Sequence, residues 1–408
     1  MTLNRRITLV ALSVVFSSSA WAGDVAHYWV DAATYGSSIP GMEGMGALAS
    51  MMGGGSEAVS FGTTEGGGGN GRYLDVVLQA TKSTQASHAV PSGLLGSPLI
   101  LTKPATTPTS HKSGREQQFD PTQKPADFKI KYYWGCAEQA KSGQPKVMTP
   151  KNLNAGAMRN DNASKRGAWG HVANNLRWPN EQNSQKLSDS ASLVGSHTLS
   201  GEGVPANFNF NLVSSNDFLD KINLATSGDF KKDALKLNWN AINNAKGYFL
   251  SAMGVKSDSN NATEMTIWVS SELQDQGHGL INYLEPKLLD QYLKQKVVLP
   301  TSIQTCTIPA GIFKDSDMVN ISMVAYGPEL NISYPDTKDK KKIEWDMRLR
   351  TKSVVSTMLM GAESGGGNFT GRNYTGRNYT SSQKGSNSGT PEPNPIEGVK
   401  KLKGLFGL

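Results

Sequence analysis

Apolar residues recur at every second position in several segments of this chain, and this alternation constrains its fold more than any other feature. In the clearest run, over 343–349, Ile343, Trp345, Met347 and Leu349 are separated by charged residues. A period of two places the apolar side chains on one face of a β-strand and the charged side chains on the other. Such strands are typical of antiparallel sheets that pack face to face around a buried core.

The same alternation marks further segments in both halves of the chain. They are 73–79, 128–134, 208–212, 235–239, 265–269 and 319–325, and a further strand is predicted over 247–253, after a turn at Asn243 and Asn244. We therefore predict a mostly β protein with two β-sandwich-like domains. The segment 98–102 lies in a proline-rich stretch and is predicted as an edge strand, because proline interrupts the hydrogen-bond ladder of a central strand.

One short helix is predicted from Pro286. This proline suits the first helical position, and Leu288, Leu289, Tyr292 and Leu293 form an apolar stripe at helical spacing. We expect a surface helix that covers a sheet, and a helix that binds a partner is the alternative.

Glycine gathers at both ends of the chain and suggests a folded middle with loose flanks. Of 43 glycines, four are consecutive at 66–69, and the tail carries the repeat TGRNY at 370–374 and 375–379. We predict a signal peptide over 1–22, a Gly/Met-rich N-terminal region over 23–71, a first β domain over 72–225, a second over 226–358, and a disordered Gly/Asn/Ser-rich tail over 359–408. The alternative for 399–408 is a short basic amphipathic helix in weak peripheral contact with a membrane.

The first 22 residues have the features of an export signal. Arg5 and Arg6 precede an apolar run over 7–16, and Ala20, Trp21 and Ala22 form a small-x-small cleavage site. A membrane anchor is the alternative, but the run is about half of the roughly 20 residues that span a bilayer. We predict cleavage after Ala22, a periplasmic or secreted location, and no transmembrane segment in the mature chain.

The charge of the chain gives no reason to expect nucleic acid as a partner. The formal charge is +7, and removal of the two arginines of 1–22, which has no acidic residue, leaves +5 for the mature chain. The lysines and arginines are scattered and locally neutralised, as over 336–342, whereas nucleic-acid proteins gather them on one face.

Cys136 and Cys306 are the two cysteines of the chain. An oxidising compartment favours a disulfide bridge between them, which would join the two halves of the sequence. Two separately buried thiols are the alternative.

No segment has the pattern of a catalytic, cofactor or metal site. There is no Gly-x-Ser-x-Gly, and the six histidines stand far apart without a His-Glu-x-x-His motif. We therefore predict no catalytic residue, no cofactor and no metal ligand. We expect the stretch with Met42, Met45, Met51 and Met52 to be a Gly-rich segment with interspersed hydrophobic residues. A Cu(I) site at these methionines is the alternative, because thioethers bind Cu(I).

Aromatic rings in a polar stretch give the best candidate for a binding site. Trp169, His171 and Trp178 could form a platform for a carbohydrate, and the alternative is that these rings are buried anchors of the first β domain. Carboxylates for glycan hydrolysis, such as Glu181, Asp189 and Glu202, are not paired by their spacing.

Two resemblances accompany these observations. The run LKLNWNAINNAKGY over 235–248 resembles the start of a fibronectin type III domain, in which a strand Trp packs under a later strand Tyr, and this implies an immunoglobulin-like sandwich. More broadly, the chain resembles a family of uncharacterised exported proteins of Gram-negative bacteria. This second resemblance rests on the following motifs: SIPG at 38–41, YWGC at 133–136, LNW at 237–239, CTIP at 306–309 and MLM at 358–360.

Together these features predict an exported, non-enzymatic envelope or surface protein with an interaction or structural role. Its partner would be an envelope protein or a glycan. The alternative is a glycan-binding protein or glycan hydrolase whose carboxylates meet only in the fold.

Overall fold

Strands dominate the computed structural model, which describes residues 25–38, 64, 70–80, 83–104, 128–149, 166–257, 263–274 and 280–360. The strands are β1 (Ala26–Ser38), β2 (Gly71–Gln79), β3 (Gln85–Ala89), β4 (Leu99–Thr102), β5 (Phe128–Trp134), β6 (Lys146–Met148), β7 (Leu176–Trp178), β8 (Gly195–Gly201), β9 (Asn209–Leu212), β10 (Ala225–Ser227), β11 (Leu235–Asn238), β12 (Gly247–Ser257), β13 (Thr263–Val269), β14 (Thr305–Ile308), β15 (Met318–Tyr334) and β16 (Trp345–Met360). The helices are α4 (Pro286–Lys294) and the 3-10 turns η2 (Ala168–His171), η3 (Ser214–Asn216) and η4 (Lys340–Lys342). The predicted mostly β class and the predicted helix are confirmed.

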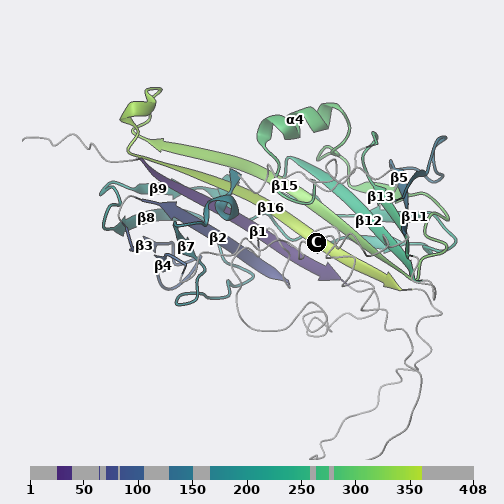
Figure 1. Cartoon of the computed structure of the whole chain (residues 1–408), viewed down its shortest axis with the longest axis horizontal. Helices are drawn as coiled ribbons and strands as arrows, with labels where there is room; N and C mark the ends of the chain where they lie inside the picture. Colours follow the sequence, from purple (N-terminus) through teal and green to yellow (C-terminus); the bar gives the residue numbers. More distant parts are fainter. Residues whose placement is uncertain are drawn as a thin grey trace, which may run out of the picture.

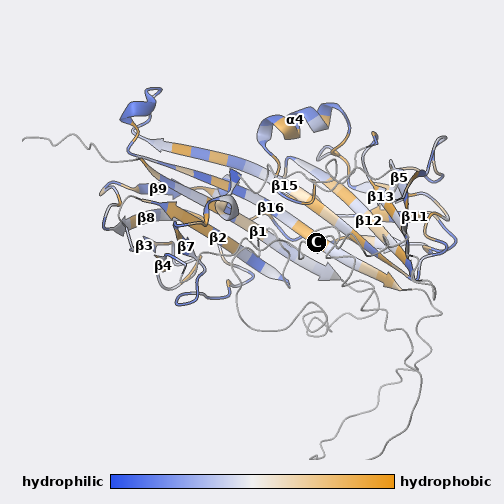
Figure 2. Ribbon diagram, viewed as in Figure 1, coloured by the Kyte–Doolittle hydropathy of each residue, from blue (hydrophilic) through white to orange (hydrophobic). Residues whose placement is uncertain are grey.

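The strands form one large sheet and one small sheet. The large sheet has the order β6-β5-β13-β12-β15-β16-β1-β2-β7-β4-β3-β8-β9, and the small sheet has the order β10-β11-β14. The long hairpin of β15 and β16 runs through the middle of the molecule (Figure 1). Figure 2 shows the alternation of hydrophobic and hydrophilic residues as bands along β15. The segment predicted as an edge strand, β4, lies instead between β7 and β3, so that prediction is wrong.

Strand β1 was not predicted, although it lies at the centre of the large sheet. It pairs in parallel with β16 over its whole length and antiparallel with β2. Its residues from Ala26 to Gly36 are almost all buried, on both faces of the sheet. A strand that is buried on both sides lacks the polar half of the alternation, which explains why the pattern did not indicate it.

At one end of the molecule, both faces of the large sheet are covered. The small sheet packs on one face and forms a core with β12, β13 and β15 that includes Leu237, Trp239, Trp268 and Ile321. On the opposite face, α4 contributes Leu289 to a core with Ile267 and other residues of β5, β12 and β13. Strands β5 and β6, which fall in the predicted first domain over 72–225, lie at this end, where β5 pairs with β13 and β6 pairs with β5.

The predicted disulfide is present between Cys136 and Cys306, whose Cα atoms are 5.2 Å apart. Cys136 follows β5 of the large sheet, and Cys306 lies in β14 of the small sheet. The bridge therefore connects the two sheets at this end of the molecule.

The other end of the large sheet curls around its own core. The core includes Tyr28 of β1, Leu99 of β4, Phe208, Phe210 of β9 and Trp345 of β16. Strands β1 and β3 are four steps apart in the sheet order, or about 19 Å in a flat sheet. Yet the hydroxyl of Tyr28 lies 2.7 Å from Nδ1 of His88 in β3. This contact requires the sheet to roll over, so that β3, β8 and β9 face β1.

Candidate functional site

The largest group of buried charged side chains crosses four strands on the face opposite the curled core. The register aligns Glu329 of β15, Arg350 of β16, Asp31 of β1 and Asp75 of β2 in one line, which we call the charged row. Asp31, Asp75 and Arg350 are at most 3% exposed. Such burial is tolerated only where charges are paired and hydrogen-bonded, so the partners of the row determine what it can do.

Asp31 and Arg350 form a two-pronged ion pair at the centre of the row. Arg350 donates from Nε and Nη2 to the two carboxylate oxygens of Asp31, both at 2.7 Å. The backbone N–H of Ala168 donates to the same carboxylate at 2.9 Å. Gly167 passes so close that an added Cβ would lie 1.5 Å from Nη2 of Arg350. The segment of η2 therefore seals the pair from the solvent side.

Tyr283, in the segment that precedes α4, also packs on the ion pair. Its ring centroid lies 4.2 Å from Cζ of Arg350, and its hydroxyl donates to the carbonyl of Ala32 at 3.0 Å. Burial raises the pKa of Tyr283 well above its ordinary value, and the nearby carboxylate of Asp31 raises it further. This phenol stays protonated and acts as a donor.

Lys352, which is 1% exposed, continues the group along β16. Its ammonium donates to the side-chain oxygen of Asn282 at 3.1 Å and lies 4.5 Å from the ring centroid of Tyr283. Asp75 accepts hydrogen bonds from the hydroxyl of Thr64 at 2.5 Å and from its N–H at 3.2 Å. The ammonium of Lys352 therefore has an oxygen acceptor and an aromatic ring beside it, and the carboxylate of Asp75 has hydrogen-bond donors.

Glu329 ends the row between two arginines. Arg166 donates to its carboxylate at 2.7 Å, and Nε of Arg348 lies 3.6 Å from it. Arg348 also donates to the carbonyl of Arg166 at 2.9 Å. Burial lowers the pKa of Arg348, and the carboxylate of Glu329 opposes that shift.

The side chains of the charged row are hydrogen-bonded or ion-paired within the fold. Each buried carboxylate accepts hydrogen bonds from donors that the fold holds in place, Asp31 from Arg350 and Asp75 from Thr64. Over the described ranges, no three His, Cys, Asp or Glu side chains gather closely enough to hold a metal ion. No α-helix within those ranges is both long and apolar enough to span a bilayer.

The predicted aromatic site is only partly assembled. His171 stacks on Trp29 with ring centroids 3.7 Å apart, and Trp169 packs against the same small cluster beside Val77. Trp178 pairs with Val76 and lies, 2% exposed, in the core on the opposite face of the sheet. For Trp178 the alternative of a buried anchor is confirmed, and the three rings do not form one platform.

The other residues singled out from the sequence are dispersed. Glu181 forms a salt bridge with Arg177 at 2.5 Å, Asp189 lies close enough to Tyr73 to raise its pKa, and Glu202 is exposed. Of the six histidines, His88 and His197 meet at 2.9 Å, although 109 residues separate them. The predicted signal peptide over 1–22, the methionines at 42–52, the glycines at 66–69 and the predicted tail beyond Met360 lie outside the described residues.

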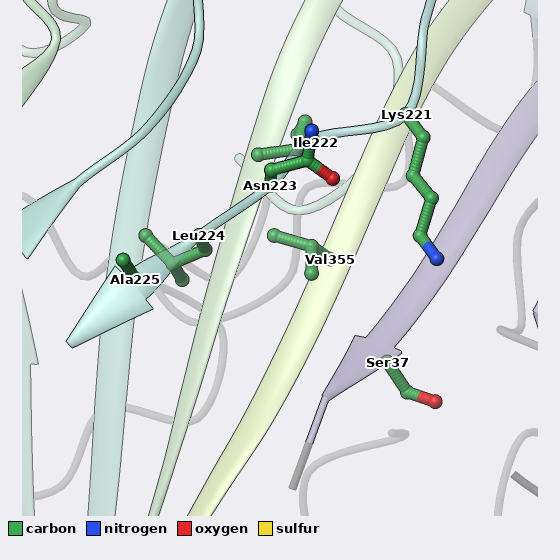
Figure 3. A pocket seen from close by; sticks show the side chains of 7 residues that line it. All are labelled: Ser37, Lys221, Ile222, Asn223, Leu224, Ala225 and Val355. Carbon is green, nitrogen blue, oxygen red and sulfur yellow. The ribbon is translucent and has the colours of Figure 1, made fainter. Parts of the chain in front are cut away.

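A groove of about 240 Å³ lies where β1 ends (Figure 3). Its lining residues are Ser37, Lys221, Ile222, Asn223, Leu224, Ala225 and Val355. The lining combines one ammonium group with mainly apolar side chains and includes no carboxylate or imidazole. The one ionisable side chain of the lining is that of Lys221.

No protein-family model matches this chain, and no curated protein shows significant sequence similarity to it.

Proposed function

We propose that this chain is an exported, non-enzymatic β-sheet protein with an interaction or structural role in the periplasm or at the cell surface. The observation that supports this most is the charged row. Its ion pair joins residues 319 positions apart, and its charges bind one another instead of facing a cavity. The signal-like residues 1–22 and the bridge between Cys136 and Cys306 support export.

We also propose that the second half forms a fibronectin type III-like sandwich. The ring centroids of Trp239 and Tyr248 lie 5.7 Å apart at nearly right angles, as the resemblance over 235–248 implies. The packing of β10, β11 and β14 against β12, β13 and β15 supports the same proposal.

Export is tested by expression of the whole precursor in a Gram-negative host, followed by fractionation and intact-mass measurement. We expect a product that begins at Gly23 in the periplasm or the medium. Recovery of the 43.8 kDa precursor in the cytoplasm would contradict the proposal.

A glycan-binding role is the second candidate, because Trp169 and His171 are only half-buried beside Trp29. Cosedimentation with purified peptidoglycan tests it. If the role is correct, Trp169→Ala weakens the association at least several-fold, whereas Leu273→Ala, at an exposed site outside this cluster, leaves it unchanged. Equal binding by both variants would remove this candidate.

A further inference from the structure

Three side chains form a continuous hydrogen-bonded chain through the curled core. The hydroxyl of Tyr28 lies 2.7 Å from Nδ1 of His88, and Nε2 of His88 lies 2.9 Å from Nδ1 of His197. Nε2 of His197 lies 2.7 Å from the carbonyl oxygen of Leu193. The three residues come from β1, β3 and β8, so the chain ties opposite walls of the curled sheet together.

The last acceptor determines the direction of every bond. A carbonyl oxygen accepts only, so Nε2 of His197 carries a hydrogen. Nδ1 of a neutral His197 then accepts from Nε2 of His88, and Nδ1 of His88 accepts from the hydroxyl of Tyr28. When both imidazoles are neutral, both are therefore in the Nε2–H form, and every polar atom of the chain is satisfied.

Within the described strands that surround this core, no carboxylate faces the two imidazoles to balance a positive charge. The side chains that face this chain come from β2, β4, β7, β9 and β16 and are apolar or aromatic, with Phe210 stacked on His197 at 4.9 Å. The charged residues Asp31, Asp75 and Arg177 of the neighbouring strands lie on the other face of the sheet. Arg72 of β2 lies on the core side, but it is a cation that packs on Phe218 and donates to the carbonyl of Ala191. The carboxylate of Asp217 accepts from the N–H of Leu193 and the hydroxyl of Ser192.

We propose that Tyr28, His88 and His197 form an acid-sensitive clamp, which holds β3, β8 and β9 over β1 at neutral pH and releases them when the imidazoles are protonated. A second hydrogen on His197 would point at the hydrogen of His88 across 2.9 Å. A second hydrogen on Nδ1 of His88 would reverse its bond with Tyr28, whose oxygen would then accept while its own hydrogen turned away. Either proton therefore disrupts the order of donors and acceptors and places a positive charge inside an apolar core.

The direction of the pH effect follows from burial. Burial lowers the pKa of His88 well below its ordinary value, and the adjacent His197 lowers it further. Burial also lowers the pKa of His197, against the effect of its bond to Leu193. The opened state thus binds protons more tightly than the closed state. The clamp is fully effective above the ordinary histidine pKa of about 6.5 and weakens as the pH falls below it.

The protonation states can be measured directly in the wild-type protein. Nitrogen-15 NMR of the imidazoles at pH 7.5 is expected to show Nε2–H signals for both His88 and His197, and a different tautomer or a cation at either site would overturn the proposal. This measurement requires no variant and therefore does not depend on whether a variant folds.

The release is tested by peptide-resolved hydrogen exchange at pH 7.5 and pH 5.0, corrected for the intrinsic rate. We expect loss of protection over 85–102 and 195–212, with protection kept over 247–257 and 318–326. Uptake of up to two protons on opening increases the opening constant by up to about 100-fold per pH unit. Uniform loss across all four segments, or no loss, would overturn the clamp.

Variants separate the clamp from other acid effects. The double substitution His88→Gln and His197→Gln keeps polar groups but removes the titration, so the difference between the two pH values should disappear. The matched control is His27→Gln, because His27 also lies in β1 but is partly exposed and paired with Asp346. This control should respond to acid as the wild type does. An acid response that persists in the double variant would contradict the proposal.

Discussion

At the scale of single residues, the ion pair of Asp31 and Arg350 joins the central strand β1 to its neighbour β16. Its charges are almost completely excluded from water, and its geometry is two-pronged. Removal of one partner leaves an uncompensated buried charge, which destabilises far more than the pair itself stabilises.

Arg350→Met is therefore expected to reduce the free energy of unfolding by about 3–5 kcal/mol, measured by urea unfolding. The double variant Asp31→Leu and Arg350→Met should recover a large part of this loss, because it leaves no unpaired charge. Lys232→Met, which removes an exposed pair with Asp229, should leave the free energy of unfolding nearly unchanged, because solvent screens exposed charges. An equal effect of the two single variants would show that the buried pair has no special role.

Gly167 tests the same site by steric means. In Gly167→Ala the new Cβ meets Arg350 at 1.5 Å and Asp31 at 2.3 Å, so η2 or the ion pair must shift. Overpacking of this kind costs about 1–3 kcal/mol, which thermal unfolding would detect as a lower midpoint. Gly96→Ala is the control, because nothing lies within 4 Å of its added Cβ. A Gly167→Ala variant as stable as this control would contradict the close packing.

At the scale of elements, the central position of β1 makes it the strand that tolerates interruption least. It has paired neighbours on both sides, β16 and β2, so each of its backbone N–H groups faces another strand. Strand β9 is an edge strand. The bond from Leu199 N–H to the carbonyl of Phe208 indicates that Asn211 turns its N–H away from β8.

Proline at these two positions should have opposite outcomes. Ala32→Pro removes a donor from the centre of the sheet and is expected to abolish the cooperative unfolding transition and the near-ultraviolet circular dichroism signal. Asn211→Pro should keep the cooperative transition and the circular dichroism signal, and its free energy of unfolding should change by at most about 1 kcal/mol. A well-folded Ala32→Pro variant would contradict the central placement of β1.

At the scale of the whole molecule, the disulfide closes a covalent loop that connects the two sheets. Cys136 and Cys306 are 170 residues apart and connect the large sheet to the small one. A crosslink of this span reduces the entropy of the unfolded chain and stabilises the folded state by roughly 5 kcal/mol on the chain-entropy model.

The double variant Cys136→Ala and Cys306→Ala is accordingly expected to unfold at a clearly lower urea concentration than the wild type. Thiol counting on the denatured wild-type protein should find no free thiol without reductant and two after reduction. Two free thiols in protein purified without reductant would show that the bridge does not form.

The sequence by itself determined the strands that bury one face, the surface helix and the pair of cysteines. In β2, β5 and β11 the alternation is legible because polar side chains recur on one side of the strand. The pattern stops at Leu349, although β16 continues to Met360. Beyond it, Arg350, Thr351, Lys352 and Ser353 are polar but buried, so they resemble a loop in the sequence.

Only the tertiary structure decided the place of β1, the partners of Asp31 and the meeting of His88 with His197. A buried polar group is stable only beside a partner, and these partners lie 319 and 109 residues away in the chain. Strand order and register bring them together, and neither is encoded in local periodicity. For the same reason the expected aromatic platform was divided, since the sheet places Trp178 on one face and His171 on the other.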